Sequence, residues 1–417
     1  MTSVVEPHAP LVARSVVLDT ATAGSLLDLL PDRGPLCWLR RGEGIVGWGE
    51  VAAVRTSGAG RFAEADAWWQ ALSGHAVVRD DVRLPGSGLV AFGSFAFADE
   101  PGDSVLVVPE VVVGRRGEVT WITTVSRGGL DADGRLQPAD PPRAPQGVSF
   151  ADGALDGERW MGVVADAVAR INRGDLEKVV LARDLVATTA EPVDVRWPLQ
   201  RLAADYPMCW TFHVEGLFGA TPEMLVRRER GLVTSRVLAG TIRRTGDDEH
   251  DLGLAAHLAR SSKDLEEHEY AVRSVADALR PYCSSLNVPE APFVLHLPNV
   301  MHLATDVAGV ADDPRASSLR LAEALHPSAA VGGTPTDAAV RLIAEIEGMD
   351  RGRYAGPVGW IDASGDGEWG LALRSGMVEG SSVRLFAGCG IVGASDPAAE
   401  LAETQAKFVP VRDAVGG

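Results

Sequence analysis

The sequence predicts a chain of antiparallel strands with helices set between them. Its first 127 residues alternate β-rich runs, such as CWLRRGEGIVGWGEVA, with glycine turns, which is typical of hairpins. Residues 156–173 and 261–282 place apolar side chains three and four residues apart, as amphipathic helices do. The chain closes with three β-rich runs joined by short glycine turns. These three observations favour a mixed fold of helices and strands.

Composition limits the class of protein and its partners. The length of 417 residues allows two or three domains, and 46% hydrophobic residues can build a large core. A net charge of −18 disfavours nucleic acid or an anionic membrane as a partner, because both bind clustered positive charge. Four cysteines without C-x-x-C spacing indicate neither a zinc site nor a disulfide framework. There is no signal-like N-terminus and no apolar run of about 18 residues, so we expect a cytoplasmic protein.

Lysine is rare in this chain. Of 39 basic residues 36 are arginine, and the three lysines are Lys178, Lys263 and Lys407. A chain that uses arginine almost everywhere can keep lysine where a compact ammonium, or an amine able to lose its proton, is needed. Chance is the alternative, and the surroundings of each lysine decide between the two.

The first 150 residues carry no recognisable chemistry. Besides the predicted hairpins we expect one helix, at residues 62–72, and core positions for Trp68 and Trp69. Residues 128–147 contain four prolines and have the composition of a surface connection. This connection need not separate independent domains.

Lys178 lies in the first strand after that connection. A helix over residues 156–173 stops at Gly174, and the strand LEKVVLARDLV follows, in which Lys178 shares a face with Val180 and Ala182. A lysine on an apolar face is either at a sheet edge or removed from water. Desolvation lowers the pKa of lysine from about 10.4, so Lys178 is a candidate base near neutral pH.

Glu223 follows Pro222 at an expected turn between two strands. Functional carboxylates are often placed in loops on a rigid scaffold, but a solvated turn residue is an equally good interpretation. Two further strands lead to Gly240 and Thr241, whose flexible backbone and hydroxyl suit the binding of a carboxylate.

The helix at residues 261–282 presents an acidic face made of Asp264, Glu267 and His268. Zinc is disfavoured, because His268 has no second histidine four residues further on. A glutamate from this helix and another from the C-terminal helix would instead suit Mg²⁺. This ion takes one or two carboxylates and keeps water and substrate oxygens.

A strand containing His302, two helices over residues 316–325 and 336–349, and the three closing strands come next. Arg374 lies in the middle closing strand. A buried arginine normally has an anionic partner, either a protein carboxylate or a ligand.

The C-terminal stretch combines glycines with a charged helix. We expect a buried strand at residues 383–387, a turn formed by Gly388, Gly390 and Gly393, and a helix with Asp396 as its N-cap. The run GCGIVG also matches a dinucleotide-binding fingerprint. Only 24 residues follow it, however, too few for the rest of that unit.

Glu400, Glu403 and Lys407 share one face of the C-terminal helix. They form either a solvated, salt-bridged face or, together with the free N–H groups of the glycine turn, a site for a metal and an anion. Competing motifs are absent, since the chain contains neither a G-x-S-x-G nucleophile turn nor a P-loop.

Taken together these motifs resemble the chorismate-using enzymes, and within them the isochorismate synthases. The resemblance covers residues 175–408, and the first 150 residues add only weak agreement. It rests on EKVVLAR, FGATPEML, LAGT, SSKDLEEHEYAV, NVMHL, LHPSAAVGGTP, RYAGPVGW, GDGEWGLALRS and AGCGIVGASDPAAELAETQAK.

This resemblance implies one large α+β unit, in which two antiparallel β-sheets pack as a sandwich with helices outside and the site between them. Residues 1–150 would be the N-terminal β-rich part of that fold, and residues 151–417 the chorismate-binding catalytic region. A monomer that uses chorismate and Mg²⁺ is expected.

The resemblance also implies a role for each matching residue. Lys178 resembles the general base that activates water, and Glu223 the acid that protonates the departing hydroxyl. Glu267 and Glu403 look like the Mg²⁺ ligands, with Glu400 beside them. The residues similar to those that hold chorismate are Gly240, Thr241, His302, Ala330, Tyr354, Arg374, Gly388 and Lys407.

Two positions indicate the reaction type. Relatives that deliver ammonia carry glutamine where this chain has Lys178, and the aminodeoxychorismate type has a nucleophilic lysine where this chain has Ala239. Water is therefore the expected nucleophile. Salicylate synthases share the lysine and remain the alternative, although KDLEEH favours a plain isochorismate synthase.

Some questions stay open at this stage. HPSAAVGG has Ser328 and Ala329 where the family pattern has threonine and proline, which concerns the shape of that loop. An inactive, chorismate-binding homologue would have lost some of the site residues, whereas all of them are present. The product could feed menaquinone or siderophore biosynthesis, and Lys263 has no assigned role.

Overall fold

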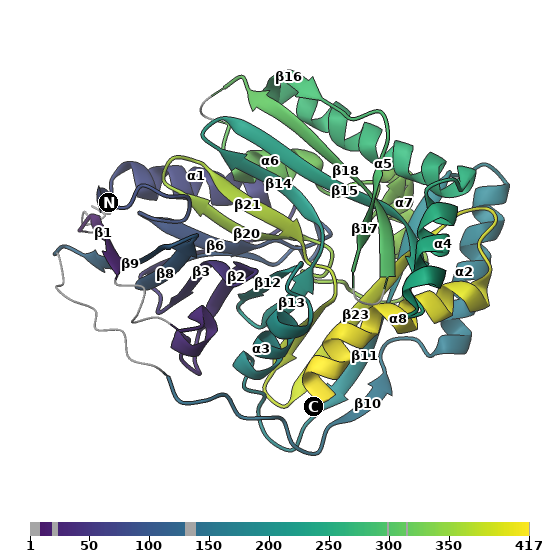
Figure 1. Cartoon of the computed structure of the whole chain (residues 1–417), viewed down its shortest axis with the longest axis horizontal. Coiled ribbons are helices and arrows are strands. Elements are labelled where there is room, and N and C mark those ends of the chain that lie inside the picture. The colour runs from purple at the N-terminus through teal and green to yellow at the C-terminus, as the bar shows by residue number, and fades with distance from the viewer. Residues whose placement is uncertain (1–8, 19–23, 130–138, 298–299, 314–315, 417) are drawn as a thin grey trace, which may run out of the picture.

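The computed structural model describes residues 9–18, 24–129, 139–297, 300–313 and 316–416, without the side chains of Lys263 and Glu267. Two large β-sheets pack face to face, with helices on their outer sides (Figure 1). No helix of the described part is long and apolar enough to cross a membrane. The surface connection expected at residues 128–147 falls partly outside the described residues.

The first sheet has thirteen strands, and nearly all of its neighbours are antiparallel. One exception is the parallel pairing of its last two members. The order along the sheet is β10 (Ser149–Asp152), β11 (Lys178–Thr188), β23 (Ser382–Ile391), β22 (Ser375–Glu379), β13 (Leu217–Thr221), β12 (Trp210–Val214), β2 (Leu36–Arg40), β3 (Glu43–Trp48), β8 (Val111–Arg116), β9 (Val119–Arg127), β1 (Leu11–Leu18) and β5 (Val77–Asp80), with β19 (Gly333–Thr334) pairing β11.

The second sheet has ten strands. Its order is β16 (Cys283–Asn287), β18 (Val300–Ala311), β15 (Leu232–Arg243), β14 (Met224–Glu229), β21 (Gly367–Leu371), β20 (Pro357–Asp362), β6 (Val90–Ser94), β7 (Ser104–Val108) and β4 (Ala52–Thr56), with β17 (Phe293–His296) pairing β18.

Helices cover the outer faces of both sheets. Helix α5 packs along β15 and β18, while α8 packs on β23 and contacts α2 and α3. The helices of the described part are α1 (Arg61–Gly74), α2 (Gly157–Asn172), α3 (Arg196–Asp205), α4 (Asp248–Leu258), α5 (Ser262–Leu279), α6 (Ser318–Leu325), α7 (Thr336–Ile346) and α8 (Pro397–Gly416), with short 3₁₀ turns η2 (Leu26–Leu29) and η3 (Arg280–Tyr282).

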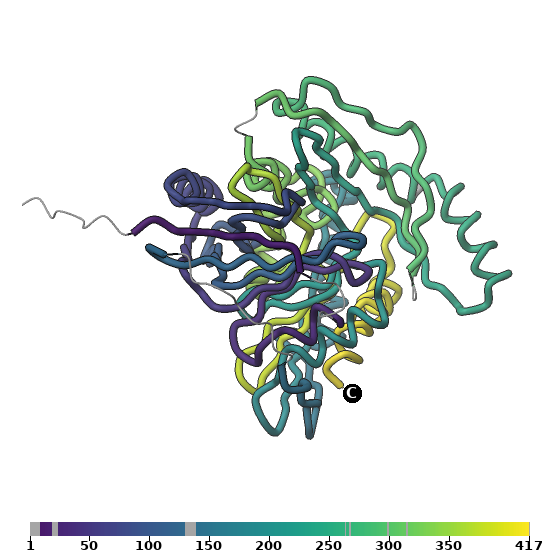
Figure 2. The backbone as a smooth tube through the Cα atoms, turned by 60° about the vertical axis from the view of Figure 1, so that its left-hand side comes forward, coloured from purple at the N-terminus to yellow at the C-terminus, as the bar shows by residue number. Residues whose placement is uncertain are grey.

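The N-terminal strands extend both sheets and do not form a sheet of their own. Strand β2 pairs with β12 in the first sheet, and β6 pairs with β20 in the second. Figure 2 shows these purple and blue strands on the left of the molecule, beside the later strands. Aromatic side chains from both parts of the chain, among them Trp38, Phe92, Phe212 and Trp360, fill one shared core. The predicted α+β fold of two packed antiparallel sheets is confirmed.

Capping residues explain where three helices begin. The carboxylate of Asp156 accepts from the Arg159 N–H at 2.8 Å at the start of α2. Ser261 caps α5 in the same way, and the Asp396 carboxylate accepts from the Ala399 N–H at 2.9 Å at the start of α8. Such caps satisfy backbone donors that have no partner inside the helix.

The predicted glycine turn after residue 387 is wrong in part. Strand β23 continues to Ile391, and Gly388 pairs with Ala182 of β11. A Cβ atom on Gly388 would lie 2.9 Å from the Leu181 carbonyl oxygen and 3.2 Å from the Tyr354 hydroxyl. The glycine is needed for this close approach to the neighbouring strand, and the turn itself comes after the strand ends.

The prediction that Arg374 lies within the second of the three closing strands is also wrong. We expected this run to form one strand, but it forms two. Strand β21 belongs to the second sheet and β22 to the first. Arg374 lies between them with a φ of 48°, in the left-handed region that L-residues seldom adopt. It therefore marks the point where the chain crosses from one sheet to the other, beside the space between them.

Candidate active site

A cavity of about 170 Å³ lies between the two sheets. Strands β11 and β23 of the first sheet and β15 and β18 of the second contribute to its wall. It brings together twelve of the thirteen predicted site residues: Lys178, Glu223, Gly240, Thr241, His302, Ala330, Tyr354, Arg374, Gly388, Glu400, Glu403 and Lys407. The thirteenth, Glu267, lies in α5, and its side chain is outside the described residues.

Lys178 is the first residue of β11, and its side chain is buried among cavity-lining groups. Its backbone pairs with Thr334 of the short strand β19. Val180 lines the same cavity, as the alternation of a strand requires. The prediction that Lys178 shares a face with Val180 is confirmed.

A fully buried ion pair fixes the strand that carries Lys178. Arg351 pairs with Glu347 at 2.6 Å and donates to the carbonyl oxygens of Val180, at 2.7 Å, and Val331, at 3.0 Å. The Glu347 carboxylate accepts from the Ala182 N–H at 2.8 Å. Arg351 also lines the cavity, and we assigned no role to it from the sequence. Arg351 and Glu347 are only four residues apart, but the backbone groups that they hold are far away in the chain, so local spacing could not show that the pair belongs to the site.

Glu223 lies between β13 and β14 with only 6% of its surface exposed. Burial raises the pKa of Glu223 to about 8, although three nearby cations, Lys178, Lys407 and Arg374, act to lower it. The Glu223 carboxyl is therefore largely protonated at neutral pH, and it faces a cavity. A protonated carboxyl in such a position can donate a proton to a ligand.

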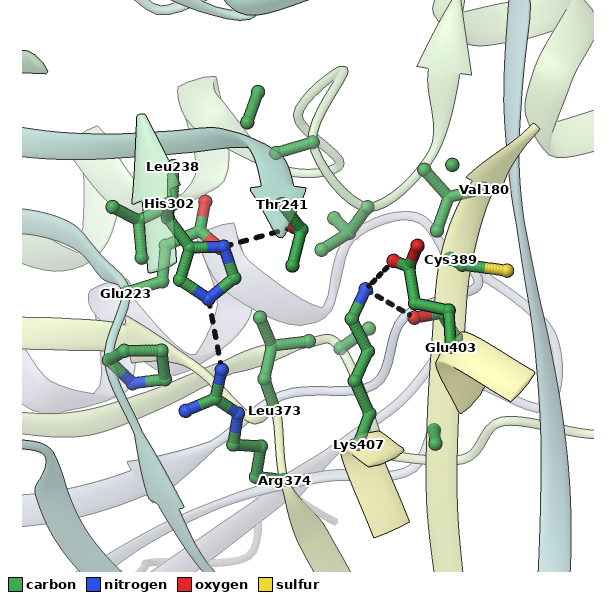
Figure 3. A pocket seen from close by; sticks show the side chains of 18 of the residues that line it. Val180, Glu223, Leu238, Thr241, His302, Leu373, Arg374, Cys389, Glu403 and Lys407 are labelled. Atoms are coloured by element: carbon green, nitrogen blue, oxygen red, sulfur yellow. Dashed lines mark hydrogen bonds and ion pairs between the residues drawn. The ribbon is translucent and has the colours of Figure 1, made fainter. Parts of the chain in front are cut away.

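Arg374, His302 and Thr241 form a chain of hydrogen bonds along one side of the cavity (Figure 3). Arg374 Nη2 donates to His302 Nε2 at 3.0 Å, so Nε2 is the acceptor and Nδ1 carries the imidazole proton. His302 Nδ1 then donates to Thr241 Oγ1 at 3.0 Å. Burial, and then Arg374, keep the pKa of His302 well below its usual value, so the imidazole is neutral. The Thr241 hydroxyl keeps its own hydrogen for another acceptor.

Arg374 has a second, unused donor group. Its Nη1 is buried and has no hydrogen-bond partner within the described part of the chain. A buried guanidinium nitrogen without an acceptor is costly. The Arg374 side chain lines the cavity, where its positive charge would favour an anionic ligand.

Lys407, from α8, lines the same cavity and points toward Glu403 (Figure 3). Its Nζ donates to the Gly388 carbonyl oxygen at 3.0 Å and pairs with Glu403 at 2.7 Å. Burial alone would lower the pKa of Lys407, but Glu403 outweighs burial and the pKa is raised. Lys407 is therefore a fixed positive charge.

Carboxylates gather where α5 and α8 meet the cavity. Asp264, Glu400 and Glu403 line it, and Gly240, with a φ of 78°, lets α5 approach because a Cβ there would lie 3.2 Å from the Asp264 Cβ. The sequence placed Asp264 on the acidic face of α5, but we did not count it among the metal-binding or substrate-binding residues. The side chains that the structure describes do not by themselves form a metal cluster of three or more.

His268 is not among the residues that line the cavity. Its ring is buried, where Nε2 bonds with Thr305 Oγ1 at 2.7 Å and Nδ1 with the Ala239 carbonyl oxygen at 3.2 Å. Asp264 and His268 both lie against β15, beside Gly240 and Ala239, as their four-residue spacing predicts, but His268 is used in these structural hydrogen bonds.

Comparison with known proteins agrees with this arrangement. A family model described as "Chorismate binding enzyme" matches residues 38–416. "Isochorismate synthase MenF" of Bacillus subtilis (strain 168) is 35% identical over 404 residues, which cover 89% of this chain and 85% of the relative. "Salicylate biosynthesis isochorismate synthase" of Pseudomonas aeruginosa is 34% identical and is covered to 90%, with 97% of this chain matched.

A solved structure shows the same fold. It is described as a putative 2,3-dihydroxybenzoate-specific isochorismate synthase, DhbC, from Bacillus anthracis, and it is 35% identical to this chain. The match has a TM-score of 0.78 and covers 94% of this chain and 98% of the other. The resemblance to isochorismate synthases is thereby confirmed, and the chain belongs to the chorismate-binding enzyme family.

Proposed function

We propose that this enzyme converts chorismate reversibly into isochorismate, with Mg²⁺ as its cofactor. The observation that carries the proposal is the cavity itself, which places a protonated glutamic acid, a buried lysine and two further cations around one space. The names of the relatives at 34–35% identity support the same reaction.

Binding of the substrate would use the cations that the cavity already holds. Chorismate carries two carboxylates, and the chain as a whole is acidic, so local positive charge is required. Arg374 and the Thr241 hydroxyl, which both line the cavity, would bind one carboxylate. Gly240, Ala330, Tyr354 and Gly388 would shape the cavity around the ring.

Glu223 is the proposed general acid. Hydroxide is a poor leaving group unless it receives a proton as the C–O bond breaks. The pKa of about 8 keeps the Glu223 proton in place at neutral pH, and a bound dianion would hold that proton more firmly still.

Lys178 is the proposed general base. It accepts a proton from the water whose oxygen bonds to C2, the ring double bonds shift, and the C4–O bond breaks as Glu223 delivers its proton. One water is consumed and one released, so the net reaction is an isomerisation. Arginine could not replace Lys178 in this role, because its guanidinium does not give up a proton.

The acidic side chains fit the proposed Mg²⁺ site. Glu403, Glu400 and Glu267 would supply hard oxygen ligands from two helices. Cys389 also lines the cavity, and its thiol donates to the Glu400 carbonyl oxygen at 3.8 Å. Mg²⁺ prefers the carboxylate oxygens to this sulfur. The ion would neutralise the ring carboxylate and withdraw electrons from the ring.

Mg²⁺ dependence can be tested directly. Turnover should stop in EDTA and return with added Mg²⁺, and Glu403→Gln should raise the Mg²⁺ concentration needed for half-maximal rate. Lys407 pairs with Glu403, so the same variant also frees Lys407, and Glu267→Gln provides the second, independent test. Full activity in EDTA would contradict the proposal.

Product analysis tests the reaction itself. Purified protein with chorismate and Mg²⁺ should give a mixture of chorismate and isochorismate on chromatography, and added ammonium should have no effect. The alternative, a salicylate synthase, would release salicylate and pyruvate without any added lyase. We also propose that the product feeds menaquinone or siderophore biosynthesis, and genes adjacent to this one would indicate which. The proposal further includes a cytoplasmic location and a monomeric state.

A further inference from the structure

A second cavity, of about 320 Å³, lies apart from the active site at the other end of β14. It has four arginines and two glutamates in its wall, an excess of two positive charges in a chain whose net charge is −18. We call it the arginine cavity, and it is lined by Trp38, Arg40, Arg41, Glu43, Gly44, Arg116, Trp210, Arg227 and Glu368.

Two of the four arginines are neutralised inside the protein. Glu368 accepts from Arg116 Nη2 at 3.1 Å and from Trp38 Nε1 at 2.8 Å, and it forms an ion pair with Arg227 at 3.1 Å. Burial would raise the pKa of Glu368, but Arg227 and Arg116 outweigh it, and the pKa is lowered. The Glu368 carboxylate is therefore ionised, and its oxygens are bound by these three partners.

The other two arginines have no carboxylate partner within the described part of the chain. Arg40 donates to the Met208 carbonyl oxygen at 2.9 Å and stacks 4.2 Å from the centre of the Trp210 ring. Arg41 only contacts the Met208 sulfur, a weak acceptor, at 3.0 and 3.2 Å. Burial and neighbouring arginines lower the pKa of Arg40, which shows that positive charge is crowded here.

We propose that the arginine cavity binds a small oxyanion, either phosphate or a dicarboxylate, as an effector of the enzyme. A guanidinium presents paired N–H donors that match two oxygens of such an anion. The stacking of Arg40 on Trp210 and its bond to Met208 hold its remaining donors in place before a ligand arrives. The anion would supply the counter-charge that Arg40 and Arg41 lack.

Strand pairing connects this cavity to the active site. Arg227 pairs with Glu368, and further along the same two strands Met224, the residue after Glu223, pairs with Gly370. A Cβ on Gly370 would lie 2.9 Å from the Trp38 ring and 3.0 Å from the Glu223 carbonyl oxygen. An anion that draws Arg116 or Arg227 away from Glu368 therefore acts on the strand pair that positions Glu223.

Binding is tested without turnover, so the test does not depend on the proposed reaction. Isothermal titration of the full-length protein with inorganic phosphate and, separately, with succinate, at constant ionic strength, should show saturable binding of at least one of the two. The tighter ligand identifies the anion class. Arg40→Gln combined with Arg41→Gln should weaken that binding at least about tenfold, the factor that corresponds to about 1.4 kcal/mol.

Control variants test whether the measured anion binding takes place at the arginine cavity. Arg79→Gln combined with Arg159→Gln removes the same net charge at exposed positions and should leave binding unchanged. Arg374→Gln, which weakens an anion contact of the active site, should leave it unchanged as well. Binding that survives in the Arg40 and Arg41 double variant, or no saturable binding of either anion, would overturn the proposal.

Kinetics test the effector role. The anion that binds should change kcat in the wild-type enzyme, and this change should be absent from the Arg40 and Arg41 double variant. An effect confined to KM that persists in the double variant would indicate competition with chorismate at the active site, which overturns the effector role. Binding with no change in kcat would overturn it too.

Discussion

Glu223 and Glu368 are equally buried, with 6% and 5% exposure, yet their acid–base properties are opposite. They lie at the two ends of the paired strands β14 and β21. Burial raises the pKa of Glu223 to about 8, whereas the pKa of Glu368 is lowered because Arg227 and Arg116 contact it directly. Glu223 makes no ion pair with any described residue, and its nearby cations act from a distance. Glu368 is ionised and structural because it forms ion pairs with two arginines. Glu223 has no such pair among the described residues, so it stays protonated and can donate a proton.

The largest expected effect is on turnover when the unpaired carboxyl is altered. Glu223→Gln keeps the shape and removes the transferable proton, so kcat should fall by about 10² to 10⁴. Thermal unfolding should be unchanged or shifted upward, because no ion pair is lost. A variant that turns over at the wild-type rate would show that Glu223 is only a buried structural residue, like Glu368.

A comparable loss of kcat is expected when Lys178, the proposed general base, is replaced. Lys178→Arg keeps the positive charge near Glu223 but cannot accept a proton, so it should be as inactive as Lys178→Ala, with a loss of roughly 10² or more in kcat. Circular dichroism would check that both variants are folded. If the arginine variant kept near wild-type activity, Lys178 would serve as a cation alone.

Replacing Glu368, the ion-paired carboxylate, should lower stability and leave kcat nearly unchanged. Glu368→Gln leaves Arg116 and Arg227 without their partner and should lower the free energy of unfolding by about 2 kcal/mol, less than for a fully buried pair because both arginines are partly exposed. Its kcat, measured below the unfolding temperature, should remain within a few-fold of wild type. A loss of kcat as large as that of Glu223→Gln, without loss of stability, would remove the distinction between the two glutamates.

The smallest effect is a pH dependence. Glu223 must be protonated to act, so kcat/KM should fall as pH rises through about 8, on the alkaline side of the profile. The folded-state pKa is raised above the unfolded value, so the stability due to this group is fully present below pH 4.5 and is lost as pH rises toward 8. Glu223→Gln should therefore become more stable relative to wild type over that range, as measured by denaturant unfolding at several pH values.

Sequence reasoning was most successful where function depends on local spacing. The faces of β11 and α8 made Lys178, Glu400, Glu403 and Lys407 candidates, the family resemblance decided between the alternatives, and all four line the cavity. Helix starts were predictable for the same reason, since a capping side chain such as Asp396 acts within three residues.

Long-range contacts explain what was missed. Arg351 became part of the site only because strands and loops far apart in sequence meet at its guanidinium. The strand containing Arg374 was misplaced because an apolar run does not record a change from one sheet to the other. Gly388 was taken for a turn residue because a glycine needed for close strand packing is identical in sequence to one needed for a turn.

The protonation state of Glu223 is the central claim, and infrared difference spectroscopy tests it most directly. Spectra of wild type minus Glu223→Gln, with no substrate bound, should contain the C=O band of a protonated carboxylic acid. This band should persist above pH 4.5 and disappear with a midpoint near pH 8. Loss of the band near pH 4.5 would mean that Glu223 is ionised at neutral pH, and would contradict its role as the general acid.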